Sequence, residues 1–254
     1  MLRQLCIATN AHQMSHSPST VIELLSIVSG IERKHELVAD VTGEDFNIFR
    51  ILGLENRENK HSAFLCELLN SKGSHGMKSR FLRTFVGMVS KITGSDFPET
   101  AWDEVLAVTE KHLGYVSENY LTGGKIDIAL IPSKGGRRIF IENKIGAGDQ
   151  QCQLVRYRND GIDTCLLYLT LDGKDASPFS REHPEKAISL KSGIDYFCIS
   201  YHRHILPWLE ECKKESADRP LLRETIAQYI NLVRHLTQTS MSHQMETEID
   251  AVLL

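Results

Sequence analysis

Two acidic residues and one lysine interrupt a pair of otherwise apolar segments, and these three residues have the types best suited to chemistry. Asp127 lies in the segment 124–131, whereas Glu142 and Lys144 lie in the segment 138–145. Both segments are rich in β-branched residues, and the Ser-Lys-Gly-Gly sequence between them is typical of a turn. The pattern therefore predicts two neighbouring antiparallel strands joined as a hairpin.

Side chains alternate between the two faces of a strand, so Glu142 and Lys144 are expected to point to the same face. If the two strands pair, Asp127 lies beside them and two carboxylates meet an ammonium group in an apolar setting. Such carboxylates repel each other unless a cation lies between them, and a divalent metal ion is the usual solution. The alternative is that Glu142 and Lys144 form a simple ion pair on an exposed strand, which contributes little to stability.

The residues Ile126-Asp127 and Glu142-Asn143-Lys144 resemble the core motif of the PD-(D/E)xK nuclease superfamily. Downstream, Gln153 and Tyr157 have the Q-x-x-x-Y spacing of its RecB-like branch. Upstream, the sequence is similar to the amino-terminal signature of one group of bacterial members, in the segments 47–54, 58–65 and 74–76. Together these segments cover roughly residues 45 to 240, so the resemblance extends over a whole domain.

The resemblance implies an α/β fold with a restriction-endonuclease-like core, in which a central mixed β-sheet is flanked by helices. Additional helices are expected at both ends of a single domain that spans residues 1–254. Residues 1–43 would form an amino-terminal helical extension. Residues 239–254 would form a tail to which the sequence assigns no role.

The implied function is that of a Mg²⁺-dependent phosphodiesterase, with Mn²⁺ as a substitute, which cleaves DNA in phage defence or DNA processing. RNA stays open as a substrate. The alternative is a module that keeps the nuclease fold and binds nucleic acid or a protein partner without turnover.

The resemblance also assigns roles to individual residues. Asp127 and Glu142 would hold the metal ion, with the backbone carbonyl of Asn143 as a further ligand, and oxygen ligands of this kind suit Mg²⁺ or Mn²⁺. Lys144 would position the attacking water or stabilise the transition state. Gln153 and Tyr157 would orient the site or the scissile phosphate.

Glu58 is the matching position for a third carboxylate near this site. It lies at the start of a predicted helix over roughly residues 57–70, and its spacing from His61 and Ser62 places the three residues on one helical face. His61 would orient Glu58 or contact phosphate. The alternative for Glu58 is a favourable interaction with the helix macrodipole, which favours acids in the first turn.

A formal net charge of −4 argues against a protein that coats nucleic acid nonspecifically, although a local basic rim can still attract phosphate. Basic residues beside the predicted strands and the Gln153 helix have the best claim to nucleic-acid contact. With His61 and Ser62, the predicted nucleic-acid-binding residues are Lys125, Arg156 and Arg158. If each chain has one site, a homodimer would make it easier to cut both strands of a duplex.

Hydrophobic periodicity and turn residues predict the elements that must position these residues. Helices are expected near 20–31, at 44–52 with Phe46, Phe49 and Leu52 in the core, at 57–70, at 78–91, and at 149–159 with Asp149 as amino-terminal cap, then from about 205 and after Pro220. One or two strands are expected within 104–120, followed by the hairpin and by strands at 164–170 and 196–200. His202 and His204 are interpreted as ordinary residues at the start of a helix.

The remaining composition is that of a globular protein, with 41% hydrophobic and 24% charged residues. The six cysteines are scattered without C-x-x-C pairs, which favours a reduced cytoplasm. The sequence contains no run of roughly 20 apolar residues, so we expect no membrane span. Its amino terminus is a poor match to a secretory signal.

Overall fold

The computed structural model describes residues 18–43, 45–97, 102, 104–161, 163–238 and 241–253. The chain divides into two compact units, one formed by Met1–Gly43 with Met241–Leu254 and the other by Glu44–Ser240. Residues 1–17 of the predicted amino-terminal extension lie outside the described residues.

The first unit is a pair of packed helices, one from near each end of the chain. Helix α1 (Pro18–Thr42) contains the helix predicted near the amino terminus, and α9 (Met241–Leu253) packs against it. Lys34 of α1 forms an ion pair of 3.2 Å with Glu248 of α9. The predicted tail is thus largely helical, and its apolar Met245, Ile249 and Val252 recur at helical spacing.

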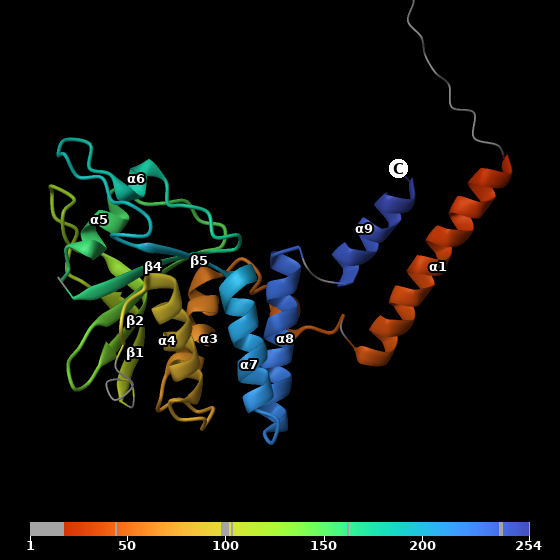
Figure 1. Cartoon of the computed structure of the whole chain (residues 1–254), viewed down its shortest axis with the longest axis horizontal. Coiled ribbons are helices and arrows are strands. Elements are labelled where there is room, and N and C mark those ends of the chain that lie inside the picture. Colours follow the sequence, from red (N-terminus) through yellow and green to blue (C-terminus); the bar gives the residue numbers. More distant parts are fainter. Residues whose placement is uncertain are drawn as a thin grey trace, which may run out of the picture. The chain divides into compact units, whose positions relative to one another are not determined.

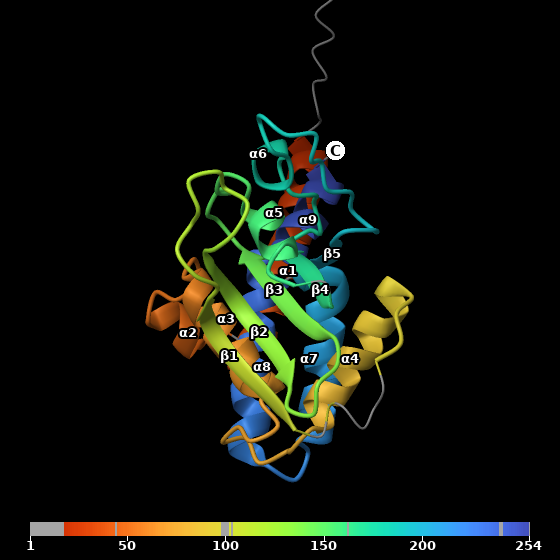
Figure 2. The ribbon, with the colours of Figure 1, turned by 90° about the vertical axis from the view of Figure 1, so that its left-hand side faces the viewer.

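The second unit is built on a five-stranded sheet with the order β1-β2-β3-β4-β5 (Figure 2). Its strands are β1 (Val105–His112), β2 (Lys125–Pro132), β3 (Arg138–Lys144), β4 (Thr164–Thr170) and β5 (Phe197–Ser200). The pairs β1–β2 and β2–β3 are antiparallel, whereas β3–β4 and β4–β5 are parallel. The sheet is therefore mixed, and the predicted hairpin is its β2–β3 pair.

Helices cover both faces of this sheet (Figure 1). One face carries α3 (Glu58–Leu69), α4 (Arg80–Thr93), α7 (Leu206–Glu215) and α8 (Pro220–Leu236), with the short α2 (Ile48–Ile51) beside α8. The other face carries α5 (Gln153–Arg158) and α6 (Pro178–Arg181). A π-helical turn, η2 (Tyr201–Ile205), joins β5 to α7.

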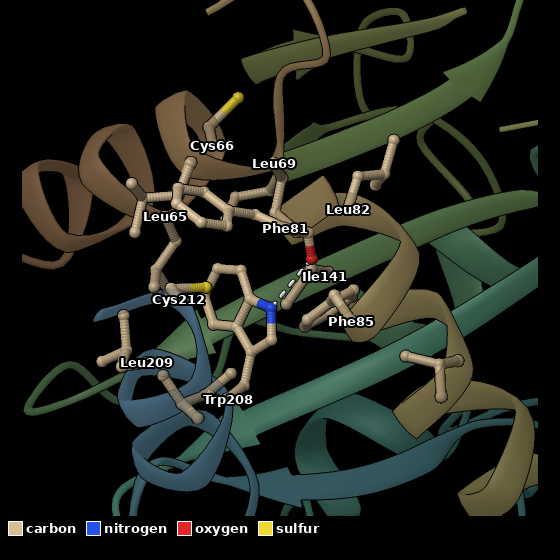
Figure 3. Packing of buried hydrophobic residues seen from close by; sticks show 14 of the residues in the cluster. Leu65, Cys66, Leu69, Phe81, Leu82, Phe85, Ile141, Trp208, Leu209 and Cys212 are labelled. Atoms are coloured by element: carbon tan, nitrogen blue, oxygen red, sulfur yellow. Dashed lines mark hydrogen bonds between the residues drawn. The ribbon is translucent and has the colours of Figure 1, made fainter. Parts of the chain in front are cut away.

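Strand alternation explains why both faces are apolar. Ile139 and Ile141 of β3 point into the larger core under α3, α4, α7 and α8, whereas Phe140 points into the smaller core under α5. In the larger core, the indole of Trp208 packs edge-on against Phe85 and donates a hydrogen bond of 2.9 Å to the carbonyl of Phe81 (Figure 3). The sheet is consequently packed on both faces.

Two predicted helices differ from the structure. The helix expected at 44–52 is only the four-residue α2, and Phe46 and Leu52 are exposed while Phe49 packs on the core. The helix expected from Asp149 begins at Gln153, because the Asp149 carboxylate accepts hydrogen bonds from Tyr168 and from the backbone of Ser177. Among the described helices, none is long and apolar enough to cross a membrane.

Candidate active site

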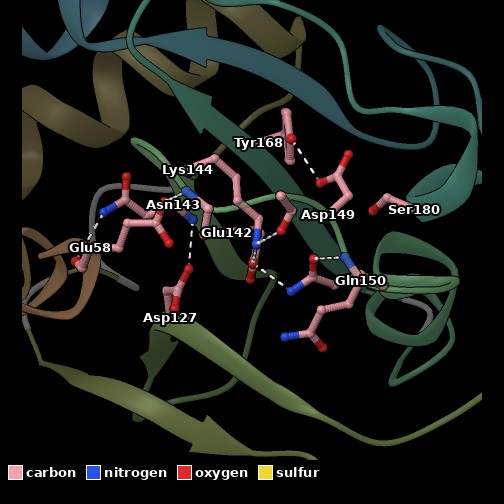
Figure 4. Close-up of polar contacts among 12 residues, drawn as sticks. Glu58, Asp127, Glu142, Asn143, Lys144, Asp149, Gln150, Tyr168 and Ser180 are labelled. Carbon is pink, nitrogen blue, oxygen red and sulfur yellow. Dashed lines mark hydrogen bonds and ion pairs between the residues drawn. The ribbon is translucent and has the colours of Figure 1, made fainter. Parts of the chain in front are cut away.

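The hairpin strands separate at the point where Asp127 lies. The β2–β3 ladder pairs Leu130 with Ile139 and Ile128 with Ile141. Beyond this point Asp127 Oδ2 accepts a hydrogen bond of 2.8 Å from the backbone N–H of Asn143. A carboxylate thus replaces a backbone acceptor where the ladder ends, and it is fixed against β3 (Figure 4).

Glu142 lies at the centre of the site and is almost fully buried, with 2% of its surface exposed. Its Oε1 lies 3.0 Å from Lys144 Nζ and accepts a hydrogen bond of 2.6 Å from Gln153 Nε2. Its Oε2 is buried and has no hydrogen-bond partner in the part of the chain that the structure describes. An unpaired buried carboxylate oxygen is costly, so an additional ligand to this atom would be favourable.

The carboxyl groups of this site are electrostatically frustrated. Burial raises the pKa of Glu142 to about 8, and the negative charge of Asp127 adds to the shift. The pKa of Asp127 is also raised, chiefly by burial, although the Asn143 N–H opposes this. Burial lowers the pKa of Lys144, but the carboxylates of Glu142, Glu58 and Asp127 outweigh it and hold that pKa above its ordinary value. Positive charge is therefore favoured here, and a second cation would relieve the carboxylates.

Gln153 and Tyr157 meet the site from one face of α5, as their spacing predicts. Gln153 Nε2 lies 3.2 Å from the hydroxyl of Tyr157, which donates a hydrogen bond of 2.8 Å to the carbonyl of Lys125 at the start of β2. Burial, with the charge of Glu142, raises the pKa of Tyr157, so its phenol stays neutral. The two side chains consequently fix Glu142 relative to β2.

The carboxylate of Glu58 binds the backbone of the loop that follows β3. Its Oε1 accepts three hydrogen bonds, of 2.7, 2.9 and 2.8 Å, from the backbone N–H groups of Ile145, Gly146 and Ala147. Its other oxygen makes no hydrogen bond within the described residues. The loop that follows Lys144 is thereby tied to α3, and Glu58 has a structural role that the macrodipole alternative does not require.

We expect Glu58→Ala to loosen this loop. The amides of Ile145, Gly146 and Ala147 should lose protection against hydrogen exchange, and the free energy of unfolding should fall by about 1–3 kcal/mol because charge-assisted hydrogen bonds are lost. Native-state hydrogen exchange measures both effects. If the macrodipole were the only role of Glu58, protection would change at the start of α3 and not at residues 145–147.

The side chain of Asn143 holds β3 on the opposite face of the sheet. It is fully buried, and its amide donates to Ser62 Oγ (3.1 Å) and more weakly to the carbonyl of Glu58 (3.3 Å). Its Oδ1 accepts a hydrogen bond of 3.1 Å from Tyr201. This network was not predicted from the sequence, in which only the backbone carbonyl of Asn143 was assigned a role.

Asn143→Ala is expected to destabilise the protein by about 2–4 kcal/mol, because it leaves the buried hydroxyls of Tyr201 and Ser62 without this partner. Tyr201→Phe removes one hydrogen bond and should cost only about 1 kcal/mol. Urea unfolding of both variants measures the difference. Equal losses would show that the amide does not connect the two partners.

Several predicted nucleic-acid contacts are corrected by burial. Ser62 is 1% exposed and bonded to Asn143, and Arg156 is 2% exposed and donates to the carbonyl of Gly123 and to Gln150. His61 is 2% exposed, and burial lowers its pKa, which favours the neutral imidazole. Its Nε2 donates to the carbonyl of Glu55 and its Nδ1 accepts from Tyr229. All three side chains are therefore nearly inaccessible and are hydrogen-bonded within the protein.

The other two predicted contacts lie at the surface. Lys125 is paired with Glu110 at 2.6 Å, and about half of each side chain is exposed. Arg158 is partly exposed at the end of α5. Both therefore stay predictions.

A divalent metal ion fits the residues of this site. In the part of the chain that is described, no three His, Cys, Asp or Glu side chains converge closely enough to hold a metal ion. The available donors are instead two carboxylates, Asp127 and Glu142, and Glu142 Oε2 has no hydrogen-bond partner among the described residues. An oxygen-only set of this kind suits Mg²⁺ or Mn²⁺, which keep several waters in their coordination shell.

Comparison with known proteins agrees with this geometry. A family model described as the PD-(D/E)XK nuclease superfamily matches residues 46–231. Searches of curated proteins and of solved structures found no match. The matched range contains all five strands and every predicted site residue, so the family and fold predicted from the sequence are confirmed. With its mixed five-stranded sheet flanked by helices, this chain belongs to the PD-(D/E)XK nuclease superfamily.

Proposed function

We propose that this chain is a nuclease that hydrolyses phosphodiester bonds in DNA with the help of Mg²⁺, for which Mn²⁺ can substitute. The observation that carries the proposal is the buried, unpaired Oε2 of Glu142 beside Asp127 and Lys144. A purely structural ion pair gains nothing from such an arrangement, whereas a cation site does.

Asp127 and Glu142 would hold the metal ion, with the backbone carbonyl of Asn143 as a further ligand. When bound, such an ion neutralises phosphate charge and makes water more acidic. The chain itself supplies the orientation: Gln153 fixes one oxygen of Glu142, and the Asn143 N–H fixes one oxygen of Asp127. Preset carboxylates need no reorganisation during the reaction.

Lys144 would hold the attacking water or a phosphate oxygen with its ammonium group and stabilise the negative charge that develops there. Its Nζ is close to Glu142 and to the carbonyl of Gly148, which limits its rotamers. Because Glu58 ties down the loop after Lys144, it would act as a positioning residue.

The test is incubation of the purified chain with supercoiled plasmid, linear duplex, single-stranded DNA and RNA, in Mg²⁺, Mn²⁺ or EDTA. We expect cleavage of DNA with either metal ion and none in EDTA. Binding without cleavage, across all metals and substrates, would instead favour a non-catalytic module on the nuclease fold.

Three further assignments belong to the same proposal. The helical unit of α1 and α9 would be an appendage of the nuclease domain. The described cysteines are all free thiols, which suits a reducing cytoplasm. Two copies of a chain with one site each would be needed to cut both strands of a duplex together, so we propose a homodimer for that reaction.

A further inference from the structure

A cavity of about 740 Å³ opens beside Lys144, on the side of the site formed by the parallel strands. Its floor is the loop after β3, and its walls come from the ends of β4 and α8 and from η2. Ligands of α/β proteins characteristically bind outside the carboxyl ends of parallel strands. Two residues of the wall, Asp149 and Tyr168, are hydrogen-bonded to each other close to Lys144 (Figure 4).

The acids of this cavity are already used within the protein. Asp149 accepts from Tyr168 and from the backbone of Ser177, and Asp175 accepts from Tyr196. Asp172 accepts from Thr170 and from the backbone of Lys174. These hydrogen bonds fix the orientation of the three carboxylates, of which Asp172 and Asp175 are exposed.

The cationic groups of the cavity are in the opposite situation. Lys174 and Arg203 are exposed, and neither side-chain head group forms a hydrogen bond or an ion pair with any residue that the structure describes. Arg203 is placed by the π-helical turn, since its backbone N–H donates to Ser200 Oγ and the N–H of Ser200 donates to His204. π-Helical turns are often found at functional sites. Lys174 also interacts electrostatically with Asp172, and the two cationic side chains lie next to the proposed phosphodiesterase site, where they are suited to phosphate.

We propose that this cavity binds the unpaired nucleotide next to the scissile phosphate, with Lys174 and Arg203 contacting its phosphate. The inference rests on the proposed nuclease function and makes single-stranded DNA, or a single-stranded end, the preferred substrate. The volume lies in the range of ~300–1,000 Å³ typical of small-molecule sites. A base that occupies a cavity of this size cannot at the same time be stacked and paired in a duplex.

The test measures binding of fluorescein-labelled single-stranded DNA and of blunt duplex DNA in EDTA, which prevents cleavage. The variants are Lys174→Ala/Arg203→Ala and, as a matched control, Lys134→Ala, whose exposed lysine lies in the turn between β2 and β3. We expect the double variant to bind single strands about tenfold more weakly, and its salt dependence to fall by about 1.4, since each phosphate contact contributes about 0.7 for single strands.

The control variant should bind as the wild type does, and duplex binding should not change in any variant. The proposal is overturned if the double variant binds single strands normally, if it loses duplex binding equally, or if the wild type does not bind single strands. Cleavage of DNA by the wild type is scored separately. A wild type that cleaves but whose binding does not depend on Lys174 and Arg203 would refute the cavity alone, whereas cavity-dependent binding without cleavage would refute the nuclease function alone.

Discussion

Glu142→Gln should reduce metal-dependent cleavage by at least about 1,000-fold, because the metal ion would no longer stabilise the transition state by several kcal/mol. The amide keeps the size of the side chain but carries no negative charge, so it binds a cation more weakly than the carboxylate does. Mn²⁺ should consequently raise the melting temperature of the wild type, through preferential binding to the folded state, and not that of the variant.

The same substitution should stabilise the metal-free protein at alkaline pH. Folding raises the pKa of Glu142 from 4.5 to about 8, so the folded state holds this proton more tightly than the unfolded state. The metal-free wild type should therefore lose stability as the pH rises from about 4.5 to about 8, by an amount on the order of a few kcal/mol. Glu142→Gln cannot ionise and should lack this loss.

Urea unfolding in EDTA at pH 5.5 and pH 8.5 measures the effect, with Glu118→Gln as a control because Glu118 is exposed in the loop between β1 and β2. The variant should exceed the wild type slightly at the lower pH and by several times more at the higher one. If Glu142→Gln were less stable at pH 8.5, the carboxylate would be a net stabilising partner of Lys144, and the cation site would lose its main support.

Lys144→Met should reduce cleavage by about 100- to 10,000-fold while leaving Mn²⁺ binding intact. The variant keeps the aliphatic stem and removes only the ammonium group, which is 3.0 Å from Glu142. Isothermal titration with Mn²⁺ separates this outcome from that of Glu142→Gln, in which binding itself is lost. Lys134→Met is a matched control at an exposed position. Wild-type turnover in Lys144→Met would mean that Lys144 is only a structural partner.

The stability of Lys144→Met should also depend on pH. Without the ammonium group the pKa of Glu142 rises further, since Lys144 is one of the groups that lower it. At pH 5.5 the carboxyl takes up a proton and the loss of stability should be small. At pH 8.5, above the pKa of Glu142 in the wild type, the variant must keep this carboxyl protonated or bury its charge without the ammonium group, so the loss of stability should be larger than at pH 5.5. A loss that is equal at both pH values would show that packing, and not charge, is responsible.

Local patterns were sufficient to predict the framework of this site. The β-branched runs around Asp127 and Glu142, with a turn between them, correspond to β2 and β3, and alternation along β3 separates Glu142 and Lys144 from Asn143. The four-residue spacing of Gln153 and Tyr157 likewise places both on one face of α5. These features depend on the periods of single strands and helices, which any sequence displays directly.

Predictions were wrong where a polar side chain forms hydrogen bonds with residues that are distant in the sequence. Asp149 has the right chemistry for a helix cap, but Tyr168 and the N–H of Ser177 take its carboxylate. Arg156 has the charge of a phosphate contact, but its guanidinium is buried and donates hydrogen bonds to the carbonyl of Gly123 and to Gln150. Neither choice is visible in the local sequence.

The sequence by itself therefore determined the family, the hairpin and the identity of the central carboxylates and lysine, because short-range periodicity and residue type suffice for these. Only the tertiary structure decided which charges are buried, that Glu58 holds a loop, and that a cavity with Lys174 and Arg203 adjoins Lys144. The physical reason is that a polar group is satisfied by whichever donors and acceptors the fold leaves unpaired nearby, and that set exists only once the chain has folded.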